Sequence, residues 1–525
     1  MRQGILLAPL AALLLVACGD DGEDGLNGAN GANGANGLNS LAVTRAVAKG
    51  DATCAGGGTL LEIGLDANRN NTLETTEVTS REYLQCLTAP KLRALHASPD
   101  APPVNIRING ASALTGVDYA QGSGFVDVAE STRVEVEAIV PGGNAVVIDR
   151  RLALDYSTEY TVLAVGKVAD PIDALVVSNP AGRAIAAGNL RAQVVHAAPD
   201  APAVDVYVTA PGAALAGSMP VNVGALSYGD ATGRAEIPAG DYRIRVTAAG
   251  NPGAVVYDSG TLALAAGADL LIAAVANTGP GAAPIELVSL DGQGSAKILD
   301  TNTPAAVVAV HASPDAPAVD LLADVVGTPT DEALGLARNV SFPAACRIGN
   351  VPAPGDYSIS VTPAGNPGVT ALSFPLQPAK GAELTAIVTG YLGSTPALQP
   401  LALASPTRAI ATEARLRVTH ASPGTGNVDL YLLPDGTDFG AASASFDAVP
   451  FGASTPVLSL APGAYDVYVT PAGNKSVVAI EVQNLALTGG QVLDVIARDA
   501  KQDASEGALP QLIVVDYASV SACPG

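Results

Sequence analysis

The sequence contains no tryptophan, only four histidines and five cysteines, and aromatic residues make up 4% of its 525 positions. Hydrophobic cores must therefore be built from Val, Leu, Ile and Ala, since hydrophobic residues still amount to 48% of the chain. Basic residues are also scarce, with 27 Lys+Arg against 50 Asp+Glu and a net charge of −23. So acidic a surface repels nucleic acid and anionic headgroups, which excludes nucleic acid as an expected partner and favours divalent cations.

The sequence also lacks the common enzyme motifs. No segment matches a phosphate-binding G-x-x-x-x-G-K-S/T loop, a four-cysteine metal set or an H-E-x-x-H motif. We therefore predict that the protein is not an enzyme. The chain is rich in turn-forming residues, with 56 Gly and 38 Pro residues between short apolar runs. This composition is typical of short strands joined by turns.

The N-terminus has the pattern of an export signal. A short basic start precedes the apolar run 5–17, which is too short to span a bilayer and closes in the sequence LVAC at 15–18. These four residues resemble the bacterial lipobox, which implies removal of residues 1–17 and lipidation of Cys18. Acyl chains on Cys18 would anchor the protein to a membrane. By resemblance to lipoprotein sorting signals, Gly19 does not suggest inner-membrane retention, and the acidic run 20–24 looks like a surface-export tether, so the outer membrane or cell surface is the expected location. An ordinary secretory signal with a chance cysteine is the alternative.

A tether and a small module follow the signal. Residues 18–40 are predicted to be a tether, because 22–39 reads G-x-y for six triplets and contains no proline. Collagen requires that period together with abundant proline, so a flexible Gly/Asn-rich spacer is the favoured interpretation. Residues 41–89 are predicted to be a module bracketed by Cys54 and Cys86. Because export implies an oxidising compartment, we expect these two cysteines to form a disulfide.

A twelve-residue segment between these cysteines, 66–77, resembles the calcium loop of EF-hands. Its oxygens fall at the spacing that a hard cation needs, because alternate residues of a curled loop point inward. The candidate ligands are Asp66, Asn68, Asn70, Thr72, Glu74 and Glu77. Asn71 stands where the EF-hand loop has glycine, and a glycine-rich segment replaces the entering helix. Calcium is the one candidate cofactor, bound weakly at about 10⁻⁴–10⁻³ M, and a plain polar turn is the alternative.

Four tandem repeats fill the remainder of the chain. All four histidines occur in one recurring motif, which reads H-A-S-P-D-A-P at His96 and His311 and varies at His196 and His420. A second marker, V-T-P-A-G-N-P or a variant of it, recurs later in each repeat. The predicted repeats span 90–189, 190–304, 305–413 and 414–525.

Within the repeats, apolar and polar residues alternate, which is the periodicity of a strand. Val204 and Val206, for example, are expected to share one buried face. Tyr242, Tyr357 and Tyr465 each follow a Pro/Gly turn, in the manner of the tyrosine corner of Greek-key sandwiches. We predict an all-β fold in which tandem Ig-like antiparallel β-sandwiches stand in a string behind the small N-terminal module.

The two markers also point to a family. The H-A-S-P-D-A-P-x-V-D start and the V-T-P-A-G-N-P turn resemble the bacterial family known as domain of unknown function 4397, over roughly residues 90–525. The resemblance implies an exported, often lipidated, tandem and Ig-like protein. It implies no activity, since the family has none assigned.

The histidine motif admits two interpretations. His196, Asp200 and Asp205, with their counterparts, could form a metal or ligand site, since histidine and carboxylates bind transition metals. Yet Asp200 corresponds to Gly424 in the fourth repeat and Asp205 to Asn105 in the first, so no constant ligand set survives. A buried, hydrogen-bonded histidine before a Pro-Asp turn is the favoured, structural interpretation.

Nucleophilic catalysis finds little support in the repeats. Ser98 lies two residues after His96, but Ala198 replaces that serine in the second repeat. Cys346 and Cys523 have no histidine at motif spacing. The sequence leaves open whether these two cysteines form a bridge or remain thiols.

The sequence as a whole favours a non-enzymatic surface or envelope lipoprotein with an adhesive or structural role. Its expected partners are the membrane, reached through the N-terminal lipid, and an unidentified extracellular or envelope component. An extracytoplasmic ligand- or glycan-binding protein is the alternative, for which Tyr207, Tyr431 and Tyr468 are the available aromatic faces. A hydrolase is a third and weaker hypothesis.

Overall fold

The computed structural model describes residues 37–525 apart from 223, 328–333, 406, 503–506 and 508. The signal segment, Cys18 and most of the tether lie outside the described residues. All regular elements of the described part are strands. None of its segments forms a helix long and apolar enough to cross a membrane. The all-β prediction is confirmed.

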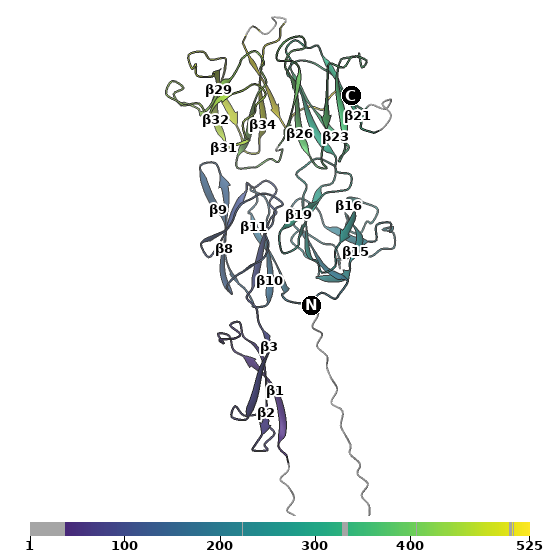
Figure 1. The fold of residues 1–525 in the computed structure, drawn as a ribbon, viewed down its shortest axis with the longest axis vertical. Coiled ribbons are helices and arrows are strands. Elements are labelled where there is room, and N and C mark those ends of the chain that lie inside the picture. The colour runs from purple at the N-terminus through teal and green to yellow at the C-terminus, as the bar shows by residue number, and fades with distance from the viewer. Residues whose placement is uncertain (1–36, 223, 328–333, 406, 503–506, 508) are drawn as a thin grey trace, which may run out of the picture. The chain divides into compact units, whose positions relative to one another are not determined.

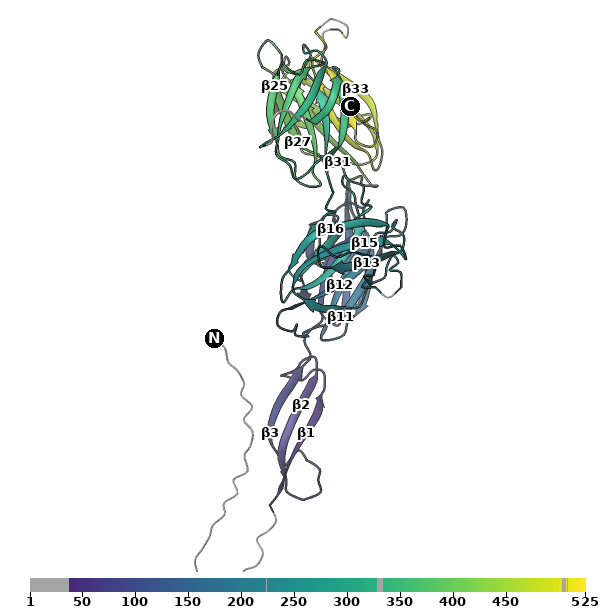
Figure 2. The same ribbon diagram turned by 90° about the vertical axis from the view of Figure 1, so that its right-hand side faces the viewer.

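The first of two compact units, Met1–Cys86, contains one three-stranded antiparallel sheet (Figure 2). Its strands are β1 (Asn39–Val47), β2 (Gly58–Asp66) and β3 (Val78–Cys86), in that order across the sheet. Along the middle strand, Glu62, Gly64 and Asp66 are buried, whereas Ile63 and Leu65 are exposed. The covered face of this small sheet is therefore the polar one.

The second unit, Leu87–Gly525, holds four β-sandwiches, numbered 1 to 4 along the chain (Figure 1). Each has a histidine sheet, which contains the strand that ends in the motif histidine, and an outer sheet packed against it. Most neighbouring strands are antiparallel, as predicted, but the histidine strand pairs in parallel with one neighbour in every sandwich. The histidine sheets are therefore mixed sheets.

Sandwiches 1 and 2 each consist of a histidine sheet and an outer sheet. The histidine sheet of sandwich 1 comprises β4 (Lys91–His96), β7 (Val126–Asp127), β10 (Thr158–Val165) and β11 (Asp173–Pro180). Its outer sheet comprises β5 (Val104–Ile108), β6 (Ala111–Val117), β8 (Ser131–Val140) and β9 (Gly143–Ala153). The histidine sheet of sandwich 2 comprises β12 (Asn189–His196), β14 (Ala235–Pro238), β17 (Asp269–Ala276), β18 (Ile285–Leu290) and β19 (Ser295–Ile298). Its outer sheet comprises β13 (Val204–Thr209), β15 (Gly240–Ala248) and β16 (Val255–Leu264).

Sandwiches 3 and 4 have four strands in each sheet. The histidine sheet of sandwich 3 comprises β20 (Ala305–His311), β23 (Ala344–Val351), β26 (Glu383–Thr389) and β27 (Gln399–Ala404). Its outer sheet comprises β21 (Val319–Val325), β22 (Leu334–Val340), β24 (Tyr357–Pro363) and β25 (Leu372–Leu376). The histidine sheet of sandwich 4 comprises β28 (Ala414–His420), β31 (Leu458–Leu460), β34 (Val492–Arg498) and β35 (Gln511–Asp516). Its outer sheet comprises β29 (Val428–Pro434), β30 (Phe446–Val449), β32 (Gly463–Pro471) and β33 (Ile480–Leu487).

Each sandwich has its own apolar core between its two sheets. In sandwich 1, Leu92 of the histidine strand packs with Ile106 and Val136 of the outer sheet. Val204 and Val206, which the alternation placed on one face, lie in the corresponding core of sandwich 2. The period-two pattern therefore identifies the face that points into the sandwich.

The histidine sheets also pack against one another, so the sandwiches form pairs instead of a string of separate domains. Leu95 of sandwich 1 shares a buried cluster with Leu271 of sandwich 2, and Val310 of sandwich 3 shares one with Ile496 of sandwich 4. Sandwiches 1 and 2 thus lie side by side, as do 3 and 4 (Figure 1). A sheet covered on both faces reads as a continuous apolar run, and all seven residues of β20 are buried.

A buried ion pair stands at the interface of the second pair. Arg417 and Asp494, on adjacent strands of sandwich 4, are both nearly inaccessible, and Arg417 Nε donates to Asp494 Oδ1 over 2.8 Å. Sandwich 3 completes the network, because Ala404 accepts a hydrogen bond from Arg417 and Thr385 donates one to Asp494. The hydroxyl of Tyr517 also donates to Asp494, over 2.6 Å. These polar contacts match sandwich 4 to sandwich 3.

Candidate functional site

The histidine of each repeat uses both of its ring nitrogens inside its own turn. His96 Nε2 donates to the carbonyl of Pro102 over 3.0 Å, and Nδ1 accepts the backbone N–H of Ser98 over 3.3 Å. The other three histidines make the same two bonds, to the residues six and two positions later. This arrangement fixes one neutral tautomer and closes the loop that follows the strand.

Burial accompanies this arrangement in every repeat. All four are at most 2% exposed. Loss of solvent lowers the pKa of His96 to about 4 and also lowers the pKa of His311 and His420 below the usual range. A neutral imidazole with both nitrogens hydrogen-bonded has no lone pair left for a metal ion.

An aromatic ring stands edge-on to every motif histidine, which sequence reasoning missed. The rings are Tyr119, Tyr228, Phe342 and Phe451, in chain order, and the centroid distances are 5.8–6.4 Å. In the last three repeats the ring follows its histidine by 31 or 32 residues, so the repeat alignment contained the signal. In a chain so poor in aromatic residues, this is a recurrent use of them.

The aspartate of the V-D strand joins the two sequence markers of its repeat. Asp205, Asp320 and Asp429 each accept the backbone N–H of the glycine in the A-G-N turn, over 2.7–2.9 Å. In the first repeat the residue is Asn105, which accepts the N–H of Gly116 instead. The first repeat therefore lacks the carboxylate and also has an altered second marker, which reads V-P-G-G-N at 140–144.

The aspartate of the H-A-S-P-D motif has a different partner in different repeats. Asp100 and Asp315 accept backbone N–H groups from the segment after the parallel neighbour strand, whereas Asp200 pairs with Lys167 of sandwich 1. In the fourth repeat the carboxylate comes from the other side, since Gly424 N–H donates to Asp499. In the first, third and fourth repeats a carboxylate therefore accepts a backbone N–H across the two segments, and either segment supplies the carboxylate.

These contacts bear on the two chemical hypotheses for the motif. Among the described residues no group of three His, Cys, Asp or Glu side chains is placed to hold a metal ion. Asp205 is engaged by Asn222 and Gly250, and Asp200 points to Lys167. The structure also pairs His96 with the backbone N–H of Ser98, and not with its hydroxyl. The serine and histidine therefore form no nucleophile–base pair.

The aromatic faces considered for glycan binding are covered. Tyr207, Tyr431 and Tyr468 are 3%, 5% and 8% exposed. In sandwich 4 the ring of Phe439 stacks on Tyr468 at 4.2 Å, and Lys475 lies over the same ring of Phe439. A sugar would need an exposed ring face, and these tyrosines do not offer one.

The polar loop at 66–77 is closed by its own side chains. Asp66 accepts the backbone N–H groups of Asn70 and Asn71, and Glu77 accepts those of Ala67 and Asn68. Asn71 adopts a positive φ of 61°, the left-handed conformation that glycine supplies in EF-hands. These hydrogen bonds curl the loop around the carboxylates of Asp66 and Glu77.

The remaining candidate ligands of this loop contact one another. Glu74 accepts the side-chain amides of Asn68 and Asn70, over 3.0 and 2.6 Å, and Asn70 Oδ1 accepts the N–H of Thr72. The donor set is all oxygen, which suits a hard cation, but an ion would have to displace the amides from Glu74. Calcium binding at this loop stays a prediction.

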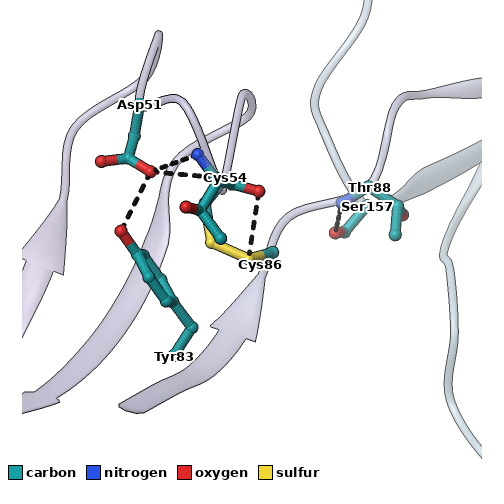
Figure 3. Close-up of a disulfide and its surroundings, with 7 residues drawn as sticks. Asp51, Cys54, Tyr83, Cys86, Thr88 and Ser157 are labelled. Carbon is teal, nitrogen blue, oxygen red and sulfur yellow. Dashed lines mark hydrogen bonds between the residues drawn. A yellow bond between two sulfur atoms is a disulfide. The ribbon is translucent and has the colours of Figure 1, made fainter. Parts of the chain in front are cut away.

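The module is closed by the predicted disulfide between Cys54 and Cys86 (Figure 3). Asp51 stands beside it, where its carboxylate accepts the N–H groups of Thr53 and Cys54 and the hydroxyl of Tyr83. The two N–H bonds and the tyrosine contact lower the pKa of Asp51. The disulfide and the aspartate together hold the loop 51–54 against the end of β3.

A second disulfide answers the question left open by the sequence. Cys346 on β23 of sandwich 3 bonds to Cys523, 177 residues later. The C-terminal segment returns to sandwich 3, where Cys523 N–H donates to the carbonyl of Arg347 and the N–H of Arg347 donates to Ser521. The bridge therefore ties the end of the chain to the neighbouring sandwich of the second pair.

Comparison with known families gives matches in both compact units. Residues 90–207, 212–322 and 305–431 match the family described as domain of unknown function (DUF4397), together more than half of the chain. The chain belongs to this family. Residues 39–86 match a second domain of unknown function, DUF7151, which coincides with the three-stranded module. No curated protein matches the chain.

The DUF4397 match confirms the resemblance carried by the two repeat markers over 90–431, in three tandem ranges, and does not cover the rest of the fourth repeat. The two disulfides add a statement about location, because such bonds persist in oxidising compartments and are rare in the cytosol. The two bridges therefore suggest an extracytoplasmic location.

Proposed function

We propose that this DUF4397 protein is a non-enzymatic lipoprotein of the bacterial cell envelope with a structural or adhesive role. One observation supports the proposal most. The polar side chains that recur in all or most repeats, the motif histidine and the V-D aspartate, are engaged in hydrogen bonds to the backbone of their own sandwich. The features that recur between repeats are therefore hydrogen bonds that hold each sandwich together. This is what we expect of a protein whose role is structural or adhesive.

The proposed anchor is the lipidated thiol of Cys18, with residues 1–17 removed. The apolar run, the LVAC sequence and an extracytoplasmic chain with two disulfides all support it. Mass spectrometry of the mature N-terminus should find an acylated Cys18 in the membrane fraction. Cys18→Ala should abolish the acylation and release the protein. An unmodified Cys18 in membrane-bound wild-type protein would contradict the anchor.

The proposed role requires exposure to a partner. Protease treatment of whole cells should degrade the protein if the DUF4397 sandwiches face outward, on the cell surface. Purified protein should then bind to whole cells, extracellular matrix or envelope fractions. A variant that lacks one pair of sandwiches, either 1 and 2 or 3 and 4, is the control. If the protein binds neither cells, nor matrix, nor envelope fractions, the adhesive role is wrong.

The hydrolase hypothesis has a direct test in the same protein. If the histidine is a brace, each of His96→Ala and His196→Ala should lower stability and leave any turnover of ester, peptide or glycoside substrates unchanged. Turnover that disappears in a variant that stays folded would reverse the assignment of the protein as non-enzymatic.

A further inference from the structure

A polar cavity of about 420 Å³ lies within the second unit, where all four sandwiches meet. Asp118 comes from sandwich 1, Glu286 from sandwich 2, Lys380 from sandwich 3 and Arg415 from sandwich 4, and the connector between sandwiches 3 and 4 adds Arg408. Its volume is in the range of small-molecule sites, which occur preferentially at domain junctions.

The cavity gathers positive charge in a chain that has little of it. Four basic side chains line it, Lys297, Lys380, Arg408 and Arg415, although the chain has nearly twice as many acidic as basic residues. Two of these four are neutralised locally, because Lys297 pairs with Glu286 over 2.9 Å and Arg408 pairs with Asp118.

The third carboxylate of the cavity, that of Glu383, forms no ion pair with Lys380 or Arg415. Glu383 pairs with Arg347, which lies outside the lining, over 2.9 Å. Within the described part of the chain, neither Lys380 nor Arg415 forms an ion pair. Two cations without a carboxylate therefore face one cavity.

The guanidinium group of Arg415 is short of hydrogen-bond acceptors. Its Nη1 donates to the carbonyl of Arg408 over 3.4 Å, while its Nε is buried and has no hydrogen-bond partner among the described residues. An unsatisfied buried donor is costly, so such groups call for a partner. Burial and the neighbouring charge of Arg408 also lower the pKa of Arg415, in agreement with a cation short of compensation.

We infer that this cavity binds a small organic anion through a carboxylate, held by Arg415 and Lys380. The planar guanidinium group of Arg415 carries several N–H donors, a geometry that matches a carboxylate. Lys380 supplies a second positive charge, and Leu299, Pro280 and the ring of Tyr119 offer apolar surface for the carbon skeleton. A free dicarboxylic acid and an acidic sugar carry the same chemistry.

Calorimetric titration of the whole chain tests this site, with succinate, glucuronate and inorganic phosphate as separate probes at low salt. We expect saturable binding of at least one carboxylate probe, weakened roughly tenfold or more by Arg415→Gln and several-fold by Lys380→Gln, because each variant removes one charged donor. Arg151→Gln, which removes an exposed cation on β9, is the matched control and should bind as the wild type does.

Lys380→Gln guards against misfolding as an explanation, because Lys380 makes no hydrogen bond or ion pair among the described residues. A bound carboxylate should also raise the melting temperature of the wild type more than that of either variant. Binding that is absent for both carboxylates, equal in all variants, or stronger for phosphate than for succinate and glucuronate would overturn the inference.

Discussion

The N-terminal module buries only Cys54 and Leu73 among the apolar side chains of its described residues, whereas each sandwich encloses a cluster of eleven or more. The covered face of the module instead holds Glu62, which is clamped by Arg45 and Arg81 from the two flanking strands. A unit of this size cannot bury enough apolar surface to be stable by that means alone. The comparison teaches that ion pairs and a disulfide replace the core in one unit and supplement it in the other.

The largest effect should come from the sandwich side of this comparison. Asp494→Leu leaves Arg417 buried without its carboxylate, so we expect a loss of about 3–5 kcal/mol in the free energy of unfolding. Guanidinium denaturation measures it. The double variant Arg417→Met with Asp494→Leu is the control and should recover most of the loss. A single variant as stable as the wild type would show that the pair is dispensable.

Removal of the module disulfide should be nearly as costly but confined to the first unit. Replacing Cys54 and Cys86 by serine opens a loop of 32 residues, for which chain entropy predicts about 3–4 kcal/mol. Hydrogen exchange should accelerate across 39–86 and stay unchanged across 87–525. Serine at Cys346 and Cys523 should show the reverse pattern. Unchanged exchange across 39–86 would mean that the ion pairs suffice to hold the sheet.

Acid should weaken the sandwiches through their histidines. The pKa of His96 is about 4 in the folded protein and 6.5 in the unfolded chain, so its contribution is complete above pH 6.5 and is lost as the pH falls towards 4. The loss at pH 4 is about 3 kcal/mol for this residue. NMR titration of the four histidine rings should give His96 a midpoint near 4. A midpoint at 6 or above would show that the ring is solvated.

A smaller loss of stability should follow when the V-D aspartate of the third repeat is replaced by the asparagine that the first repeat has at this position. Asp320→Asn keeps one acceptor oxygen and leaves the N–H of Asn339 or of Gly365 unpaired, which should cost about 1–2 kcal/mol. Thermal unfolding measures the change. Asp324→Asn on the same strand is the control and should change stability by less than about 0.5 kcal/mol. Equal losses for Asp320→Asn and Asp324→Asn would show that the hydrogen bond between Asp320 and Gly365 does not stabilise the sandwich.

The smallest effect concerns the polar loop of the module. If it binds calcium with a Kd of about 10⁻³ M, then 2 mM calcium stabilises the first unit by about 0.7 kcal/mol. Calorimetric titration should show heat that Glu77→Gln removes, while Arg151→Gln on sandwich 1 leaves it intact. No heat at millimolar calcium in the wild type would leave a polar turn closed by its own side chains.

Local patterns were sufficient for much of this architecture. Alternation along 204–208 predicted the face that enters the core, and the Tyr242, Tyr357 and Tyr465 hydroxyls do bond back across their turns. The Cys54–Cys86 bridge followed from two cysteines in one small module. Each of these features depends on residues close in sequence, so the pattern itself contains the information.

By itself, then, the sequence determined the fold class, the fourfold repetition, the family and the small disulfide-closed module. The tertiary structure alone decided that the sandwiches pair, that the histidine strand runs parallel to one neighbour, and that Cys346 meets Cys523. It also decided that Arg415 and Lys380 line one cavity. The physical reason is range: alternation shows that a side is apolar, but which distant surface covers a doubly apolar sheet depends on packing among residues more than 100 positions apart.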